Sequence, residues 1–257
     1  MTHSRKWEYE VRIATYNIWN HDTLWQKRID AICQEVKRID ADVIALQEVR
    51  SYEEGSVAHD IAEATGYPYC VFHAYPDSPD EGLAFLSKIP LSSVEAIWEE
   101  DVEESNFCAT RVTLIFGGQE WGLTNVHLNW RSSSIRECQM EVVRDWLSKG
   151  RQKAIEVLCG DFNDHPRSNI YDDVSDAGWL DVTTFVAGES QPTLDVKHNP
   201  YLQSSHLEQP ERYDWILFRS ECSELGVQHI DVFGDMRTSR DVVPSDHYGV
   251  MVDFTVN

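Results

Sequence analysis

The sequence predicts an α/β fold, in which helices return the chain to neighbouring strands of a partly parallel sheet. Residues 11–18 are typical of a strand, residues 25–39 carry apolar side chains at helical spacing, and residues 42–48 form a second strand. Elements of these lengths make a right-handed crossover. A helix over 134–149 leads in the same way into a buried strand at 155–161. We therefore expect two halves of similar element order, each an α/β layer.

Both long helices are preceded by a capping-box pattern, in which Thr23 and Ser134 stand three residues before Gln or Glu. Between the halves, short connections predict antiparallel strands at 69–73, 83–87, 91–98, 107–116 and 120–128. Shorter helices are expected near 57–65 and 170–177. Residues 168–209 are otherwise loop-rich and are expected to form part of a cleft rim. The chain closes with strands at 212–218 and 250–256.

The length of 257 residues, without a Pro/Gly/Ser-rich linker, predicts a single domain over residues 1–257. The apolar runs are shorter than the roughly 20 residues of a membrane span, and residues 1–10 lack the apolar core of a secretory signal. The six cysteines show no metal-ligand spacing, as is typical of reduced thiols. We therefore expect a soluble, cytoplasmic protein.

The net charge of -22, from 44 acidic and 22 basic residues, restricts the partners of this chain. Proteins bind polyanions mainly by neutralising phosphates with Lys and Arg. The overall charge therefore argues against a general nucleic-acid binder, although a local basic patch beside a cleft would be compatible with it.

Polar residues recur where predicted strands begin or end. Asn17, Glu48, His127 and Asp161 each end a strand, Asn163 follows two residues later, Asp214 lies near the start of a strand, and Asp246-His247 precede the last strand. Open α/β sheets bind ligands at the carboxyl ends of their strands. Taken alone, Asp161 and Asn163 fit a strand followed by an Asx turn better than a site, but the whole set favours a site. Its carboxylates and carboxamides suit Mg²⁺ or Mn²⁺ better than zinc.

Six motifs carry a family resemblance: TYNI, LQEV, NVHL, GDFN, YDWI and PSDH, in this order between residues 12 and 254. The chain resembles the endonuclease/exonuclease/phosphatase superfamily. That deoxyribonuclease I-like group includes exonuclease III-type endonucleases, neutral sphingomyelinases and inositol polyphosphate phosphatases. The resemblance implies a four-layer α/β sandwich, with two mixed sheets packed face to face and helices outside.

The resemblance also implies a role for each strand-end residue. Glu48 and Asp246 would hold a divalent cation, Mg²⁺ or Mn²⁺, with Asn17 in or beside its ligand shell. His247, oriented by Asp214, would be the general acid/base. Asp161 would position or activate the attacking water, Asn163 would bind a phosphate oxygen, and His127 would stabilise the charge on the phosphate. The implied reaction is hydrolysis of a phosphodiester or phosphomonoester by in-line attack.

The substrate is left open by the sequence. The acidic composition favours a small-molecule or lipid-borne phosphoester, with a DNA or RNA nuclease as the first alternative and a non-catalytic, partner-binding member of the fold as the second. Glu81 either pairs with His127 or is a turn residue, and Arg111 either reaches the substrate or is packed and paired. Trp19 and Trp130, just past strand ends, are candidates for the cleft wall.

Overall fold

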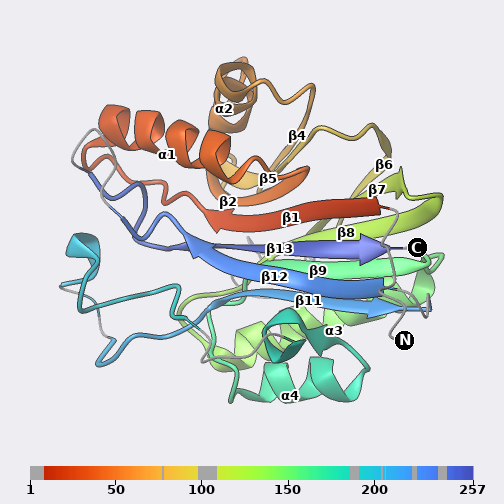
Figure 1. Cartoon of the computed structure of the whole chain (residues 1–257). Coiled ribbons are helices and arrows are strands. Elements are labelled where there is room, and N and C mark those ends of the chain that lie inside the picture. Colours follow the sequence, from red (N-terminus) through yellow and green to blue (C-terminus); the bar gives the residue numbers. More distant parts are fainter. Residues whose placement is uncertain are drawn as a thin grey trace, which may run out of the picture.

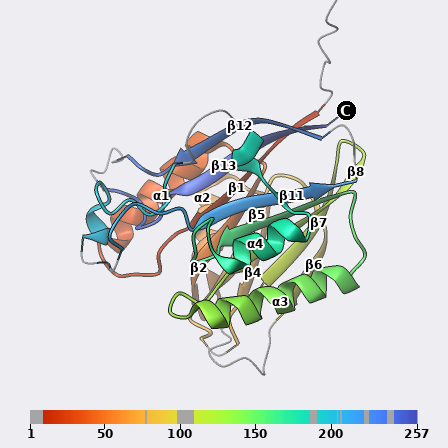
Figure 2. The same ribbon diagram turned by 90° about the horizontal axis from the view of Figure 1, so that it is seen from below.

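Two mixed β-sheets pack face to face in the computed structural model, with helices on both outer faces (Figure 1). The structure describes residues 9–76, 78–97, 109–185, 191–203, 205, 207–221, 225–236 and 242–256. Helices α1 (Trp25–Ile39) and α2 (Val57–Thr65) cover one sheet, and α3 (Ser133–Lys149) and α4 (Asn169–Asp176) cover the other (Figure 2). The predicted four-layer α/β sandwich is confirmed.

The first sheet contains the crossover predicted at the start of the chain. Its order is β12 (Leu225–Phe233), β13 (Gly249–Val256), β1 (Tyr9–Asn17), β2 (Val43–Tyr52), β5 (Glu81–Ser87) and β4 (Tyr69–Ala74), with β3 (Gly55–Ser56) beside β2. β1 and β2 are parallel and are joined by α1, whereas the other pairs are antiparallel. The parallel pair brings the ends of β1 and β2 to one edge.

The second sheet repeats this arrangement around another parallel pair. Its order is β10 (Leu180–Asp181), β11 (Asp214–Ser220), β9 (Ile155–Asp161), β8 (Gln119–His127), β7 (Ala109–Phe116) and β6 (Leu91–Ile97). β8 and β9 are parallel and α3 joins them, while β11 runs antiparallel to β9. Two short 3₁₀ helices, Val182–Phe185 and Pro200–Leu202, lie within the loop-rich segment 168–209.

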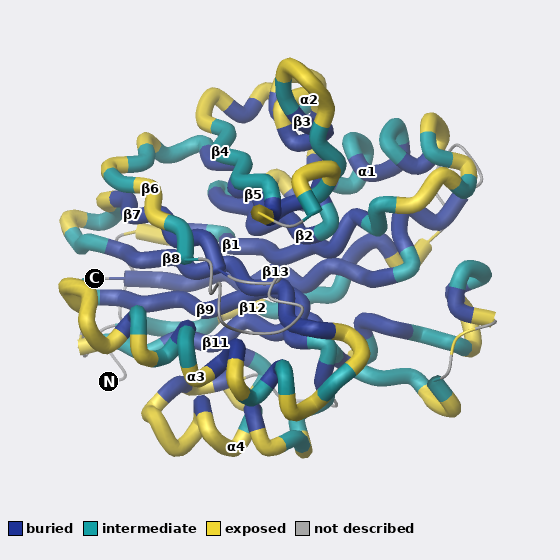
Figure 3. The backbone as a smooth tube through the Cα atoms, turned by 180° about the vertical axis from the view of Figure 1, so that it is seen from behind, coloured by how far each residue is buried: buried dark blue, intermediate teal, exposed yellow. Residues whose placement is uncertain are grey.

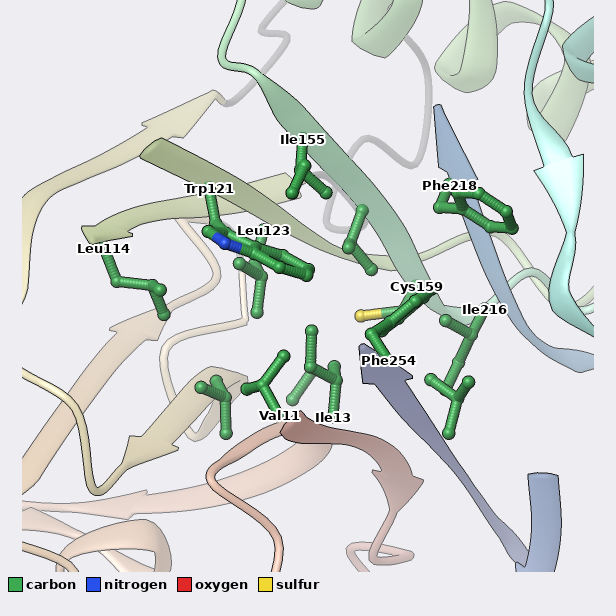
Figure 4. Packing of buried hydrophobic residues seen from close by; sticks show 14 of the residues in the cluster. Val11, Ile13, Leu114, Trp121, Leu123, Ile155, Cys159, Ile216, Phe218 and Phe254 are labelled. Atoms are coloured by element: carbon green, nitrogen blue, oxygen red, sulfur yellow. The ribbon is translucent and has the colours of Figure 1, made fainter. Parts of the chain in front are cut away.

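The apolar core lies between the facing sheets. Val11 and Ile13 of β1 face the second-sheet side chains Trp121, Ile155 and Cys159 in one buried cluster (Figure 4). Cys159 therefore packs as a small apolar residue and is a free thiol, as are the other described cysteines. The tube in Figure 3 shows the inner strands buried, whereas the edge strands β4, β6 and β12 and the outer helices and loops are more exposed. No described helix is long and apolar enough to cross a membrane.

A buried polar bridge joins the two sheets directly behind the strand ends. Asn125 of β8 donates through Nδ2 to the carbonyl oxygens of Leu46 (2.9 Å) and Ala84 (3.1 Å) in the first sheet. Gln47 Nε2 donates to Asn125 Oδ1 at 2.7 Å. Because Gln47 precedes Glu48 and Asn125 lies two residues before His127, the bridge fixes the two halves of the strand-end edge relative to each other.

The helix starts differ from the predicted capping boxes. The N-cap of α3 is Ser132, whose Oγ accepts a hydrogen bond from Ile135 N at 3.4 Å, two residues before the predicted Ser134. The N-cap of α1 is Leu24, in the left-handed region at φ 49°, with no side-chain cap. The guanidinium of Arg28 donates to the Thr23 carbonyl oxygen at 2.8 Å, so this turn is held by backbone carbonyls rather than by a hydroxyl cap.

Candidate functional site

The ends of the two parallel pairs deliver the predicted residues to one edge of the sandwich. Asn17 ends β1, and His127 and Asp161 end β8 and β9 in matching register. Glu48 was predicted to end its strand, but β2 continues to Tyr52, and Glu48 lies inside it at the irregularity between Leu46 and Val49. Asp214 begins β11 directly opposite Asp161. Asp246 and His247 precede β13, the antiparallel neighbour of β1, so they lie at the same edge. These residues at the starts of antiparallel strands complete the predicted set of site residues.

Asp161 is the residue on which the predicted set converges. Its Oδ2 accepts a hydrogen bond from Asn17 Nδ2 at 2.9 Å and lies 3.7 Å from the Nε2 atoms of both His127 and His247. Its Oδ1 accepts the backbone N–H of Asn163 at 2.8 Å. Burial raises the pKa of Asp161, against the opposing charge of His247. A buried carboxylate of raised pKa, held on both oxygens, is suited to accept a proton.

His247 and Asp214 form a buried pair. His247 Nδ1 lies 2.9 Å from Asp214 Oδ2, and because a carboxylate only accepts, Nδ1 carries the proton and Nε2 faces Asp161. Burial lowers the pKa of His247, but the charges of Asp214 and Asp161 and the hydrogen bond outweigh it, so the pKa lies well above the ordinary value. The imidazole is therefore oriented and is stabilised in its charged form.

His127 has the opposite electrostatic environment. Its Nδ1 lies 2.9 Å from the hydroxyl of Tyr75, which follows β4 and is 1% exposed. Burial lowers the pKa of His127, although the charge of Asp161 opposes this. The two imidazoles beside Asp161 thus differ in the partner of their Nδ1 atom, which is the Asp214 carboxylate for His247 and the Tyr75 hydroxyl for His127. A neutral imidazole can still donate one N–H to a substrate oxygen.

Glu48 supplies the oxygens of the first-sheet side. Glu48 is half-buried and adopts φ 53°. It lies within an irregularity in the pairing of β2 with β5, which turns its side chain out of the regular register of the strand. Oε1 accepts from Asn17 Nδ2 at 3.0 Å, and Oε2 accepts from the backbone N–H of Asn20 at 3.0 Å. Asn17 therefore uses one amide group to hold carboxylates from both sheets.

Asp246 lies beside this group without joining a tight cluster. The described His, Asp and Glu ligand atoms within 4.8 Å of one another form two sets, Glu48 with His127 and Asp161, and Asp161 with Asp214 and His247. Burial and the charge of Glu48 raise the pKa of Asp246 to about 7. Asn199 Nδ2 holds the loop by donating to the backbone oxygens of Ser245 (2.9 Å) and Asp246 (3.0 Å).

The donor set fits a hard cation. Among the described residues, Asp214 Oδ1 is buried and has no hydrogen-bond partner. This atom is a carboxylate oxygen that no described donor of the edge satisfies, and the charge of Glu48 adds to burial in raising the pKa of Asp246. Carboxylate and carboxamide oxygens are the ligands that Mg²⁺ and Mn²⁺ accept. Glu48 and Asp246 are half-buried sources of such oxygens on the first-sheet side. Asn17 beside them is fully buried, and its Oδ1 accepts the N–H of Trp19 at 3.0 Å.

The Endonuclease/Exonuclease/phosphatase family model matches residues 14–247. The chain belongs to this family. Protein angel homolog 2 of Bos taurus is 28% identical over 200 residues, covering 64% of this chain and 36% of the relative. A putative neutral sphingomyelinase of Drosophila melanogaster is 27% identical over 183 residues, covering 63% and 41%. The chain thus spans well under half the length of these curated relatives.

Solved structures of similar fold cover nearly the whole chain. Danio rerio TDP2, crystallised with a single-strand DNA product, has a TM-score of 0.79 at 22% identity and covers 96% of this chain and 99% of its own. An endonuclease/exonuclease/phosphatase from Bacteroides vulgatus has a TM-score of 0.78 at 18% identity, covering 97% and 100%. At these identities the likeness establishes the fold of the family.

Several supporting residues of this family member were not predicted. Arg28, fully buried on α1, donates to carbonyl oxygens that include Ile18 (3.1 Å) and Pro244 (3.2 Å), so one guanidinium joins the loop after β1 to the loop before Asp246. Thr193 Oγ1 accepts from Asp214 N at 3.2 Å. Tyr75 was also missed. Their partners are distant in sequence, and no local pattern marks them.

Two open alternatives are resolved by the structure. Arg111 Nη2 donates to both carboxylate oxygens of Glu156 at 2.7 Å, within a buried pair, so the interpretation as a packed arginine is confirmed. Glu81 does not show the expected pairing with His127. Its carboxylate accepts from Asn20 Nδ2 at 3.0 Å, and burial together with the charge of Glu48 raises its pKa to about 7.

The two tryptophans past the strand ends differ in their surroundings. Trp19 is covered by the Arg28 guanidinium (4.5 Å from the ring centroid), by the His21 ring (4.5 Å) and by Tyr201 (4.8 Å). Trp130 is 59% exposed. Trp19 is therefore a packed part of the rim, whereas Trp130 presents its ring to solvent.

Proposed function

We propose that the chain is a divalent-metal-dependent phosphoesterase that hydrolyses its substrate by in-line attack of water. The observation that carries the proposal is the position of Asp161 Oδ2, which lies 3.7 Å from Nε2 of both His127 and His247. A proton acceptor between two imidazoles suits a reaction in which one proton leaves a water and another reaches a leaving group. We also propose that the chain acts as one domain, because each sheet supplies only part of the site.

Asp161 is the residue that orients the water and takes its proton. Its two oxygens are fixed by Asn17 and by the N–H of Asn163, and each oxygen retains a lone pair for a further bond. The raised pKa of this carboxyl, caused by burial, increases its basicity. The fixed position limits the directions from which a bound water can attack.

His247 protonates the leaving oxygen, and Asp214 orients its ring. Because the Nδ1 proton is held by Asp214, the Nε2 proton is the one that reaches the substrate. The neutral imidazole left behind regains a proton at Nε2, and its source is the Asp161 carboxyl, which took a proton from the water and whose Oδ2 lies 3.7 Å away. The buried Asp214 carboxylate supports the charged state without itself contacting the substrate.

His127 and Asn163 donate hydrogen bonds to the non-bridging phosphate oxygens. Asn163 adopts φ 52°, and its Nδ2 donates to the Leu128 carbonyl oxygen at 2.9 Å, which fixes the amide and leaves its second N–H for a ligand. Tyr75 fixes His127 from the other side of its ring. Donors that are already oriented stabilise developing charge without reorganisation.

Glu48 and Asp246, with Asn17 beside them, are the residues we assign to the cation, Mg²⁺ or Mn²⁺. When bound, the ion would neutralise charge on a phosphate oxygen and polarise the phosphorus centre. Asn17 Nδ2 donates to both Glu48 and Asp161, so it holds these two carboxylates in position against their mutual repulsion.

The substrate we favour is a small or lipid-borne phosphoester rather than a long nucleic acid. A net charge of -22 disfavours the many simultaneous phosphate contacts on which polyanion binding depends. A nuclease reading is kept open by the family, whose solved members include a TDP2 bound to single-strand DNA.

The proposal is tested by assaying the purified chain on bis-p-nitrophenyl phosphate, p-nitrophenyl phosphate, DNA, RNA and sphingomyelin. We expect hydrolysis of at least one ester with Mg²⁺ or Mn²⁺ and none with a chelator. Asp161→Asn should abolish the activity, whereas Asp145→Asn on the exposed side of α3 should preserve it. Absence of metal-dependent hydrolysis of all five substrates would refute the proposed function.

A further inference from the structure

The exposed ring of Trp130 lies on a loop that is unusually well fixed. The backbone N–H of Asn129 donates to Gln139 Oε1 at 2.8 Å, and Arg136 Nη1 donates to the Asn129 carbonyl oxygen at 2.9 Å. Asn129 Oδ1 accepts the N–H groups of Arg131 and Ser132, both at 2.9 Å. The backbone on both sides of Trp130 is therefore held, and its ring is presented from a rigid support.

The same loop is tied to the residues assigned to phosphate binding. Leu128 N donates to the Asp161 carbonyl oxygen at 2.9 Å, and the Leu128 carbonyl oxygen accepts from Asn163 Nδ2 at 2.9 Å. Trp130 follows Leu128 by two residues and His127 by three. A group that contacts Trp130 can therefore belong to the same small molecule as a phosphate held by His127 and Asn163.

The surroundings of the ring indicate what it binds. Arg131 Cζ lies 4.6 Å from the Trp130 ring centroid, so a planar cation already stacks on the indole. The adjoining residues Asn129, Arg131, Ser132, Ser133 and Ser134 are polar, which argues against insertion of this loop into a bilayer. Because Trp130 is still 59% exposed with this guanidinium over one part of its ring, the indole offers surface on which a flat aromatic group that carries a phosphate can stack.

We propose that Trp130 is a stacking platform for the nucleobase of a nucleoside phosphoester, bound next to the scissile phosphate. The proposal rests on the proposed function and names the class of its substrate. A single base with few phosphates is compatible with the acidic composition, because one stacking contact replaces part of the electrostatic attraction that a longer polyanion requires. Trp19 cannot serve this role, since Arg28, His21 and Tyr201 surround its ring.

Two esters with the same leaving group test the platform. Thymidine 5′-(p-nitrophenyl phosphate) and methyl p-nitrophenyl phosphate differ only in the nucleoside, so the ratio of their kcat/KM values reports its contribution. We expect the wild-type ratio to favour the nucleoside ester, and Trp130→Ala to lower the ratio roughly tenfold, as for loss of one stacked base. Trp130→Tyr should restore most of it. Ile115→Ala, 64% exposed at the opposite end of β7 and β8, is the matched surface control.

A binding measurement separates this inference from the proposed function. Titration calorimetry with thymidine 5′-monophosphate and Mg²⁺ should show affinity that falls roughly tenfold in Trp130→Ala, whether or not any ester is hydrolysed. A five-residue oligothymidylate that binds with the same affinity as thymidine 5′-monophosphate would indicate that Trp130 stacks on the base of a free nucleotide ester. Tighter, salt-sensitive binding of the oligothymidylate would indicate that Trp130 stacks on the end base of a nucleic-acid strand. An unchanged ratio and unchanged nucleotide affinity in Trp130→Ala would overturn the proposal. So would a Trp130→Ala defect confined to binding of phosphatidylcholine vesicles.

Discussion

The two sheets build the site from the same unit but contribute different chemistry. Each supplies a parallel strand pair joined by a helix, β1-α1-β2 in one case and β8-α3-β9 in the other. The first sheet provides Glu48 and Asp246, which are half-buried oxygen donors. The second provides His127, Asp161 and Asp214, which are 3%, 1% and 0% exposed. Accessible carboxylates on one side suit an ion that enters from water, and buried ones on the other suit proton transfer.

This contrast teaches that the topology fixes where the functional residues lie, while burial decides what each can do. Among the contacts that cross between the halves, two hydrogen bonds join residues with assigned roles in the reaction, from Asn17 to Asp161 and from His247 to Asp214. The first contact joins Asn17, beside the proposed cation, to the proposed base Asp161. The second joins the proposed acid His247 to the carboxylate that orients it. If the division is correct, variants of the two sides should fail in different ways.

The largest expected effect comes from the His247–Asp214 contact. His247→Ala should lower turnover by about 10³-fold, within the range of positioned acid/base catalysis. Asp214→Asn should cost a comparable factor, because it removes the charge and favours the wrong tautomer of the imidazole. Since both act in one step, the double variant should lose little more than the worse single one. Steady-state kinetics at saturating Mn²⁺ measures all three.

Two results would break the dyad assignment. One is multiplication of the two losses in the double variant. The other is an Asp214→Asn enzyme that loses Mn²⁺ affinity yet keeps its activity at saturating metal, which would make Asp214 a metal ligand.

A smaller effect should isolate the first-sheet side. Glu48→Gln should weaken Mn²⁺ binding by about tenfold, as for loss of a charged ligand, whereas Asp161→Asn should lose turnover instead. The pKa of Asp246 is about 7, so below this pH the cation must displace a proton. Wild-type affinity should therefore fall by about tenfold per pH unit below 7 and level off above it. Titration calorimetry across this range checks both expectations, and equal Mn²⁺ affinity in Glu48→Gln would remove that residue from the ligand shell.

The smallest effects concern the helices of the two units, whose starts are stabilised differently. Ser132→Ala should lower the free energy of unfolding by about 1 kcal/mol, because Ser132 Oγ caps α3. Leu24→Gly should raise it by up to about 1 kcal/mol, because it relieves a left-handed backbone at an exposed leucine. Thr23→Ala should change it by less than about 0.5 kcal/mol. Urea unfolding of the three variants is the measurement, and a larger loss in Thr23→Ala than in Ser132→Ala would reverse the assignment of the caps.

The strand-end residues were predictable because periodicity and motif agreed on the same positions. Asn17, His127 and Asp161 fall at the last residue of β1, β8 and β9, so counting along each strand was enough. Strand β12 was missed. Its apolar residues alternate at Leu225 and Val227 and resume one step out of phase at Ile230 and Val232, because the pairing is irregular between Val227 and His229.

Contacts between distant segments were beyond reach of the sequence. Tyr75 and His127 are 52 positions apart, and Arg28 and Pro244 are 216 positions apart, so no local pattern relates them. The capping boxes failed for a related reason. Thr23 and Ser134 both satisfy the pattern, but the loop entering each helix, held by Arg28 in one case and by Asn129 in the other, sets where the first turn begins.

The pairing of β1 with β13 also determines when the first sheet can form during synthesis of the chain. Tyr9 pairs with Val256 and Thr15 with Val250, so the central strand of the first sheet waits for one of its two neighbours until almost 250 further residues have left the ribosome. A nascent chain at that stage carries an unpaired, apolar strand edge, which is prone to aggregation and calls for chaperone protection. Because Asp246 and His247 directly precede β13, the site cannot be complete before this last strand of the first sheet has been synthesised.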